Sequence, residues 1–118
     1  MAFDRERLDV DNVALDFLAL ADEVIQHLLR GRSHLADQLT RASTSIVLNL
    51  AEGTGQFSRP DKRRYYLTSS SSATESAAIL DVCFRLKLID PQVHERGKGL
   101  LERVVSMLVK LAKSLEGD

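Results

Sequence analysis

Apolar residues recur every three or four positions along almost the whole chain, and this period constrains the fold more than any other feature. Such spacing places apolar side chains in one stripe along an α-helix, whereas a half-buried β-strand needs strict alternation. The pattern is interrupted near residues 31–32, 53–58 and 89–90. It therefore predicts four helices, at about residues 11–30, 33–53, 58–88 and 91–116, and no strand. The third predicted helix is long for a globular protein.

Residues typical of helix ends stand at these interruptions. Gly31 suits the left-handed conformation that often follows a helix. Ser33 and Ser58 are candidate N-caps, and Asp61 has the spacing of a capping box behind Ser58. Asp90-Pro91 is typical of a helix start. Because the connections are short, neighbouring helices are expected to be antiparallel, which gives an all-α, up-down-up-down four-helix bundle in a single domain over residues 1–118.

The bulk properties exclude several classes of protein. A chain of 118 residues suffices for one domain with its own core, and its net charge of -1 gives no overall attraction to nucleic acid or to an anionic membrane. No apolar run reaches the roughly 20 residues of a membrane span, and the charged N-terminal segment does not resemble a signal peptide. The single cysteine, Cys83, is typical of a reducing compartment. We therefore expect a cytoplasmic protein that does not contact a membrane.

The third predicted helix carries two seams of apolar or small residues. Each seam keeps the three-four alternation, so two adjacent faces of this helix can be buried. One seam is expected to face the protein's own bundle. The other is expected to face a neighbouring subunit of a homo-oligomer, and this predicted oligomer face consists of Ser69, Ser72, Ser76 and Ile79.

The main charge cluster consists of Arg59, Lys62, Arg63 and Arg64, at the predicted start of the third helix. Positive charge at a helix N-terminus is unfavourable for the helix dipole, so a negative partner is expected. One interpretation is a surface paired within the chain, for which the first helix offers several acidic residues. The other is a phosphate or nucleic-acid patch, with Tyr65 beside it for stacking on bases. The residues leave both interpretations open.

The sequence contains no pattern for catalysis, for a cofactor or for a metal. Glu23 and His27 are the best candidate metal ligands, but a di-metal bundle needs a Glu-x-x-His pair on each of two helices. The sequence places no general base near the hydroxyl-rich run at residues 68–76, which a nucleophilic serine or threonine would need. The segment Gly53-Thr54-Gly55 lacks the preceding strand and remaining spacing of a phosphate loop. We therefore expect no enzyme activity, no cofactor and no metal site.

Five polar residues border the apolar stripes and are predicted to form a buried, fully paired network: Arg41, Ser45, Asn49 and Glu52 in the second helix and Glu75 in the third. Such networks fix the register of packed helices more than they add stability. On this hypothesis, Arg41→Leu leaves buried carboxylates unpaired and lowers the melting temperature sharply.

The second helix also carries most of a resemblance to a known family. Its residues follow the pattern Gln-x-x-Arg-Ala-x-x-Ser-Ile-x-x-Asn-Ile-Ala-Glu-Gly, with Leu50 in place of an isoleucine, through Gln38, Arg41, Ala42, Ser45, Asn49 and Ala51-Glu52-Gly53. Further matches are Ser58, Arg64, Ser72 and Glu75. Over roughly residues 10–115 the chain resembles small bacterial proteins known as intervening-sequence proteins of large-subunit ribosomal RNA, or S-twenty-three ribosomal proteins.

This resemblance implies a four-helix bundle that assembles into a closed ring, with pentamers known in the family, and no established activity. A related branch, the accessory proteins of diversity-generating retroelements, binds nucleic acid through a strongly basic surface, which a chain of net charge -1 lacks. We therefore expect a non-enzymatic homo-oligomer, a pentamer by resemblance, that acts as a scaffold or interaction module. The alternative is a nucleic-acid-binding accessory protein that uses the basic cluster at residues 59–64.

Overall fold

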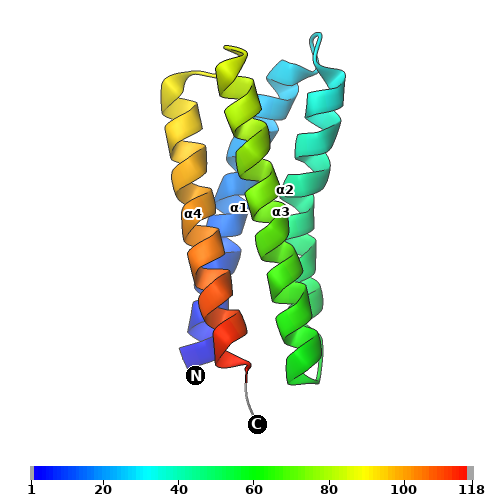
Figure 1. Ribbon diagram of the computed structural model, residues 1–118, viewed down its shortest axis with the longest axis vertical. Coiled ribbons are helices and arrows are strands. Elements are labelled where there is room, and N and C mark those ends of the chain that lie inside the picture. The colour runs from blue at the N-terminus through cyan, green and yellow to red at the C-terminus, as the bar shows by residue number, and fades with distance from the viewer. Residues whose placement is uncertain (1, 117–118) are drawn as a thin grey trace.

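The computed structural model describes residues 2–116 and contains four α-helices: α1 (Ala2–Leu28), α2 (Ser33–Thr54), α3 (Arg59–Arg85) and α4 (Pro91–Ser114). They run alternately up and down in a bundle of 50 × 23 × 18 Å (Figure 1). Each helix packs on two neighbours, so α1 and α3 lie diagonally opposite, as do α2 and α4. We call the end where α1 and α3 begin the basal end, and the opposite end the apical end. The predicted fold class is confirmed.

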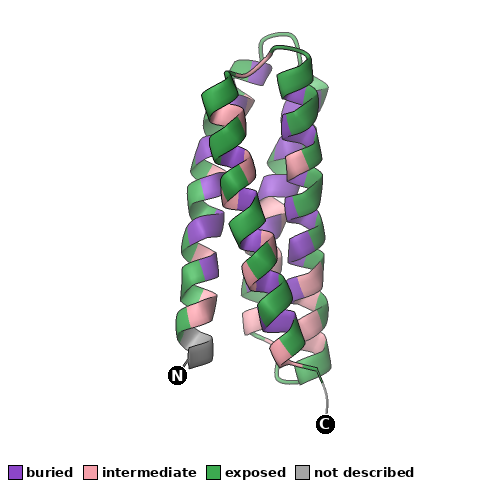
Figure 2. Cartoon of the chain, turned by 60° about the vertical axis from the view of Figure 1, so that its left-hand side comes forward, coloured by how far each residue is buried: buried purple, intermediate pink, exposed green. Residues whose placement is uncertain are grey.

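The core lies along the bundle axis and receives one face of each helix, as the burial colours of Figure 2 show. Its largest fully buried side chains include Phe17, Leu39, Ile46, Leu80 and Leu108. Burying a side chain of this size contributes about 1.5–3 kcal/mol. The described part of the predicted domain therefore has one continuous core, and residues 1, 117 and 118 lie outside the described residues. None of the four described helices is both long and apolar enough to cross a membrane.

Two helix boundaries differ from the prediction by more than two residues. Helix α1 begins at Ala2 rather than near residue 11. The prediction missed its first turns because they carry charged residues without an apolar stripe. Helix α3 ends at Arg85 rather than Leu88, because Lys87 takes a left-handed conformation with φ 62°. The N–H of Leu88 donates to the carbonyl of Cys83 at 2.8 Å, and that of Lys87 to Phe84 at 3.0 Å. These two bonds form a Schellman motif with lysine where glycine is usual.

The predicted caps have mixed outcomes. The hydroxyl of Ser58 accepts a hydrogen bond from the N–H of Asp61 at 3.2 Å, so the capping interaction predicted for α3 is confirmed. Ser33 was predicted to cap α2, but it is the first helical residue; the N-cap position belongs to Arg32, which makes no side-chain cap. Asp90 occupies the N-cap position of α4 before Pro91, without a side-chain cap bond.

Two helical glycines allow neighbouring helices to approach. A Cβ added to Gly53 would lie 2.7 Å from Cε1 of Tyr66, on the adjacent α3. A Cβ added to Gly97 would lie 2.6 Å from Cδ1 of Leu80 and 3.3 Å from Cδ2 of Leu20. Gly53, which the sequence suggested to be part of a flexible break, is thus a buried helical position that the Tyr66 ring covers.

The prediction that one face of α3 contacts another subunit is wrong, because the residues of that face are buried inside the single chain. Ser69 donates to the main-chain carbonyl of Ile46 on α2 at 2.7 Å, and Ser72 exchanges a 2.8 Å hydrogen bond with Ser45. Ser76 and Ile79 are buried on the same side of α3. The physical reason is the place of α3 between α2 and α4: a helix with two neighbours buries two seams within its own bundle.

Candidate functional site

The basic cluster lies at the basal end, where α2 and α4 end and α3 begins. Lys62 Nζ donates to the carbonyls of Thr54 at 2.9 Å and Gly53 at 3.4 Å, at the end of α2. Arg59 Nη2 donates to the carbonyl of Ser114 at 3.1 Å, at the end of α4. The last carbonyls of a helix have no partner inside the helix and carry partial negative charge. These two cations therefore stabilise the ends of the helices on either side of α3.

The other two cations of the cluster also have partners within the chain. Arg63 forms an ion pair with Glu116 at 3.0 Å. Arg64 lies 3.6 Å from Asp61, and its guanidinium carbon is 5.1 Å from the centroid of the Tyr65 ring. These pairs are exposed and contribute little stability. The partners differ from the acidic residues of the first helix proposed from the sequence, because α1 lies diagonally across the bundle from α3.

A pocket of about 530 Å³ opens beside these cations, between the start of α1, the junction of α2 with α3 and the last turn of α4. It is lined by Arg7, Arg59, Lys62 and Tyr66, together with apolar residues of α4. The Nε atom of Arg7 is buried without a hydrogen-bond partner in the described part of the chain; the nearby Asp11 Oδ2 is 3.8 Å away. Burial raises the pKa of Asp11, although the charge of Arg7 acts in the opposite direction. We refer to this site as the basal pocket.

The predicted polar network is only partly present. Asn49 Nδ2 donates to the hydroxyl and to the carbonyl of Ser45, each at 2.9 Å, and Ser45 bonds to Ser72 on α3. In contrast, Arg41, Glu52 and Glu75 are exposed. No ion pair involves any of these three within residues 2–116. The network is therefore a small serine–asparagine cluster, and the sharp loss of stability predicted for Arg41→Leu no longer follows for the single chain.

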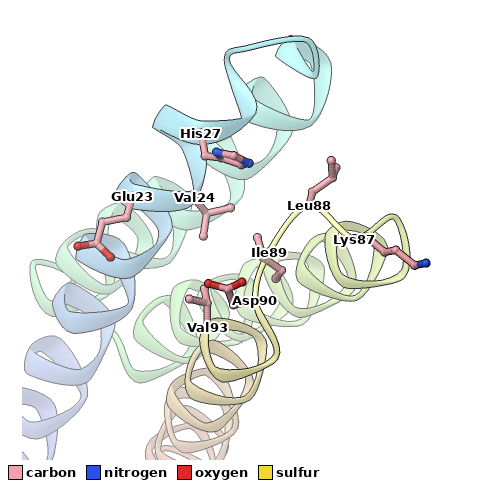
Figure 3. A pocket seen from close by; sticks show the side chains of 8 residues that line it. All are labelled: Glu23, Val24, His27, Lys87, Leu88, Ile89, Asp90 and Val93. Atoms are coloured by element: carbon pink, nitrogen blue, oxygen red, sulfur yellow. The ribbon is translucent and has the colours of Figure 1, made fainter.

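The candidate metal ligands Glu23 and His27 line a second pocket, of about 320 Å³, at the apical end (Figure 3). Both lie on α1, and the His27 ring points toward the connection at Lys87–Asp90. In Figure 3 the carboxylate of Glu23 and the imidazole of His27 point in different directions. In the described residues, no three histidine, cysteine, aspartate or glutamate side chains gather closely enough to hold a metal ion.

One polar cluster, on the outer surface of α3 and α4, was not predicted from the sequence. Lys98 Nζ donates to Asp81 Oδ1 at 2.7 Å, and His94 Nε2 lies 2.8 Å from the same oxygen. The His94 ring stacks on Phe84, with centroids 4.2 Å apart. The hydrogen bond from Lys98, and after it that from His94, lowers the pKa of Asp81. The four-residue spacing of His94 and Lys98 places both on one helix face, which was the only signal available.

The single thiol is fully buried in the core, and burial raises the pKa of Cys83. A buried, protonated thiol is a poor nucleophile. Cys83 is therefore part of the packing of α3.

A family model described as 23S rRNA-intervening sequence protein matches residues 6–110. The chain belongs to this family. The resemblance predicted from the motif in α2 is thus confirmed for the 23S rRNA-intervening sequence proteins. Among solved structures, the chain is similar to a protein of unknown function from the S23 ribosomal protein family of Bacteroides thetaiotaomicron, with a TM-score of 0.87 and 20% identity over 92% of this chain and 98% of that one. At that identity the likeness establishes the fold. A comparison with curated proteins found no match.

Proposed function

We propose that this 23S rRNA-intervening sequence protein is a non-catalytic, cytoplasmic interaction module that assembles with further copies of itself. The observation that carries the proposal is the position of its motif residues. Arg41 and Glu52 belong to the motif in α2, yet both point away from the core and form no ion pair within the described chain. Side chains that neither pack the core nor pair within the chain are available to a partner.

The surface around these residues combines both charges with apolar side chains. Leu48 is 63% exposed on α2 between Arg41 and Glu52, and Val82 is 45% exposed on α3, two turns beyond Glu75. We define this set, Arg41, Leu48, Glu52, Glu75 and Val82, as the outer α2–α3 face. A surface with exposed apolar side chains and charges of both signs is suited to pairing with another copy, in which the arginine of one copy would meet a glutamate of the next.

Native mass spectrometry and light scattering of purified protein test this proposal. The variants Leu48→Arg and Arg41→Glu are expected to lower the native mass, while circular dichroism stays unchanged because both side chains are exposed in the single chain. Arg103→Glu, which reverses an exposed charge on α4, is the matched control and should keep the wild-type mass. A wild-type monomer would refute self-association, and a full-size assembly in both variants would exclude the outer α2–α3 face.

A second candidate function is nucleic-acid binding at the basal end, and one observation favours it. Arg64 has a side chain that is 68% exposed and lies beside the Tyr65 ring, a combination that can contact phosphate and base together. The other cations of the cluster already bond to carbonyls or to Glu116, so this candidate has weaker support. Retention on heparin at low salt that is lost in Arg64→Glu is the expected result. Failure of the wild-type protein to bind heparin would remove the candidate.

A further inference from the structure

The basal pocket differs from the apical pocket in its charge. Arg7, Arg59 and Lys62 contribute three cations to its lining, and none of its described lining residues is acidic. The apical pocket, in contrast, mixes Glu23 and Asp90 with a lysine and a histidine. The described lining of the basal pocket therefore selects for one sign of charge.

The helix ends beside the basal pocket do not cancel this charge. Each helix C-terminus is equivalent to roughly −0.5 of an elementary charge, so the ends of α2 and α4 together supply roughly −1. Three cations line the pocket and the carboxylate of Asp11 lies 3.8 Å from Arg7, which leaves a positive excess of roughly one charge. An anion in the pocket is therefore favoured even though two helices end there.

The cations also keep unused hydrogen-bond donors. Arg59 uses one of its guanidinium nitrogens on the carbonyl of Ser114, and an arginine side chain has five N–H donors. Lys62 makes two bonds to carbonyls, of which the one to Gly53 is long at 3.4 Å. Arg7 also lines the cavity, with the carboxylate of Asp11 3.8 Å from its Nε. Several donors from α1 and α3 thus converge on one cavity.

The remaining lining of the basal pocket consists of an apolar wall and the hydroxyl residues Thr54 and Ser114. Leu111 and Leu115 of α4 and the largely buried ring of Tyr66 form part of its wall. A volume of about 530 Å³ lies within the roughly 300–1,000 Å³ range of sites for small molecules. A carboxylate or phosphate alone would satisfy the cations but would leave this apolar wall in contact with water.

We propose that the basal pocket binds a small organic anion: a carboxylate, on a short apolar chain or ring, that lies between Arg7, Arg59 and Lys62 while its apolar part packs on Leu111, Leu115 and Tyr66. Charge-assisted bonds from arginine and lysine to the carboxylate would give orientation, and the leucines would give selectivity for an apolar body. This inference is independent of self-association, because the basal pocket and the outer α2–α3 face share no residue.

The test is a titration of isotope-labelled protein with hexanoate, followed by amide chemical shifts. Hexan-1-ol has the same apolar chain without the charge, and inorganic phosphate has charge without the chain. We expect saturable shifts with hexanoate at residues around the basal pocket, and no saturable shifts there with either control ligand. Arg59→Met and Arg7→Met are each expected to weaken hexanoate binding about tenfold, since each removes a charge-assisted interaction and keeps an apolar stem. Two variants are used so that, if one of them folds poorly, the other still tests the proposal.

The matched control variant is Arg85→Met, which removes an exposed arginine at the apical end of α3. It should bind hexanoate as the wild type does. Three results would each overturn the proposal: no saturable hexanoate shifts, equal binding of hexan-1-ol or phosphate at the basal pocket, or equal weakening by Arg85→Met. The first two would show that the pocket does not select an apolar anion, and the third would show that any surface cation serves.

Discussion

The contact between Gly53 and the Tyr66 ring gives a prediction whose size can be worked out. In Gly53→Ala, the new methyl carbon would lie 2.7 Å from Cε1 and 2.9 Å from Cδ1 of Tyr66. Favourable carbon–carbon contacts are at about 3.5–4.0 Å, so the methyl group would be about 1 Å too close. Tyr66 is only 5% exposed and Ser69 holds α3 to α2, so the backbones cannot separate and the clash is relieved only if the ring turns toward the basal pocket that it lines. Overpacking of this kind costs about 1–3 kcal/mol.

The helix propensity of alanine acts in the opposite direction. Replacing a glycine by alanine inside a helix stabilises it by about 1 kcal/mol, and by less in the last turn, where Gly53 lies. Gly99→Ala is the matched control, because Gly99 lies inside α4 and an added Cβ there meets nothing within 4 Å. We expect Gly99→Ala to be about 1 kcal/mol more stable than the wild type and Gly53→Ala to be up to about 2 kcal/mol less stable.

Urea denaturation followed by circular dichroism measures both differences. All proteins must be compared at one concentration, because self-association would make stability depend on concentration. The destabilisation by Gly53→Ala should shrink in a Tyr66→Leu background, since a smaller and more flexible side chain leaves room for the methyl group. If Gly53→Ala were as stabilising as Gly99→Ala, the ring would be free to move, and the reasoning from close approach would be refuted.

Three further substitutions test other parts of the bundle. Lys87→Gly should raise the free energy of unfolding by about 1 kcal/mol, because glycine adopts φ 62° without strain; an unchanged urea midpoint would contradict this. Ser69→Ala should cost about 1 kcal/mol through loss of its bond to α2, and more than Ser76→Ala, whose bond stays within α3; equal costs would argue against the cross-helix bond. The pKa of Asp81 is lower in the folded protein than in the unfolded chain, where it is near 3.8. The ionised carboxylate therefore stabilises the fold above pH 3.8, and this contribution is lost as the pH falls through the lower pKa of the folded state. The difference in melting temperature between wild type and Asp81→Asn should therefore shrink below pH 3.8, and a constant difference would exclude the ion pair.

The sequence predicted the order of the helices well, but it predicted poorly which residues on each helix are buried. The three-four period and the turn residues predicted four helices in the right order, because helical burial leaves a periodic record in the sequence. The first turns of α1 left no such record, since charged residues form helix without a stripe. The end of α3 was misplaced because a lysine occupies a left-handed position for which the sequence signal is glycine.

The errors in the candidate sites have one physical origin. Spacing shows which residues share a side of a helix, but it does not show what covers that side. Ser72 and Glu75 are one turn apart on α3, yet the serine is buried against α2 and the glutamate is exposed. Arg41 and Ser45 differ in the same way on α2. The basal pocket could not be predicted at all, because it joins side chains from all four helices and from Leu115, just after α4.

The bonds of Lys62 and Arg59 have a consequence for how the bundle opens. Helix ends commonly fray one at a time, with free energies far below that of global unfolding. Here the first turn of α3 holds the last carbonyls of both α2 and α4, so neither end can unwind without breaking a contact to α3. The basal ends of three helices should therefore open as one cooperative unit. In hydrogen exchange, amides in the last turns of α2 and α4 would share similar protection, and Lys62→Met would lower the protection of both helix ends to a similar extent.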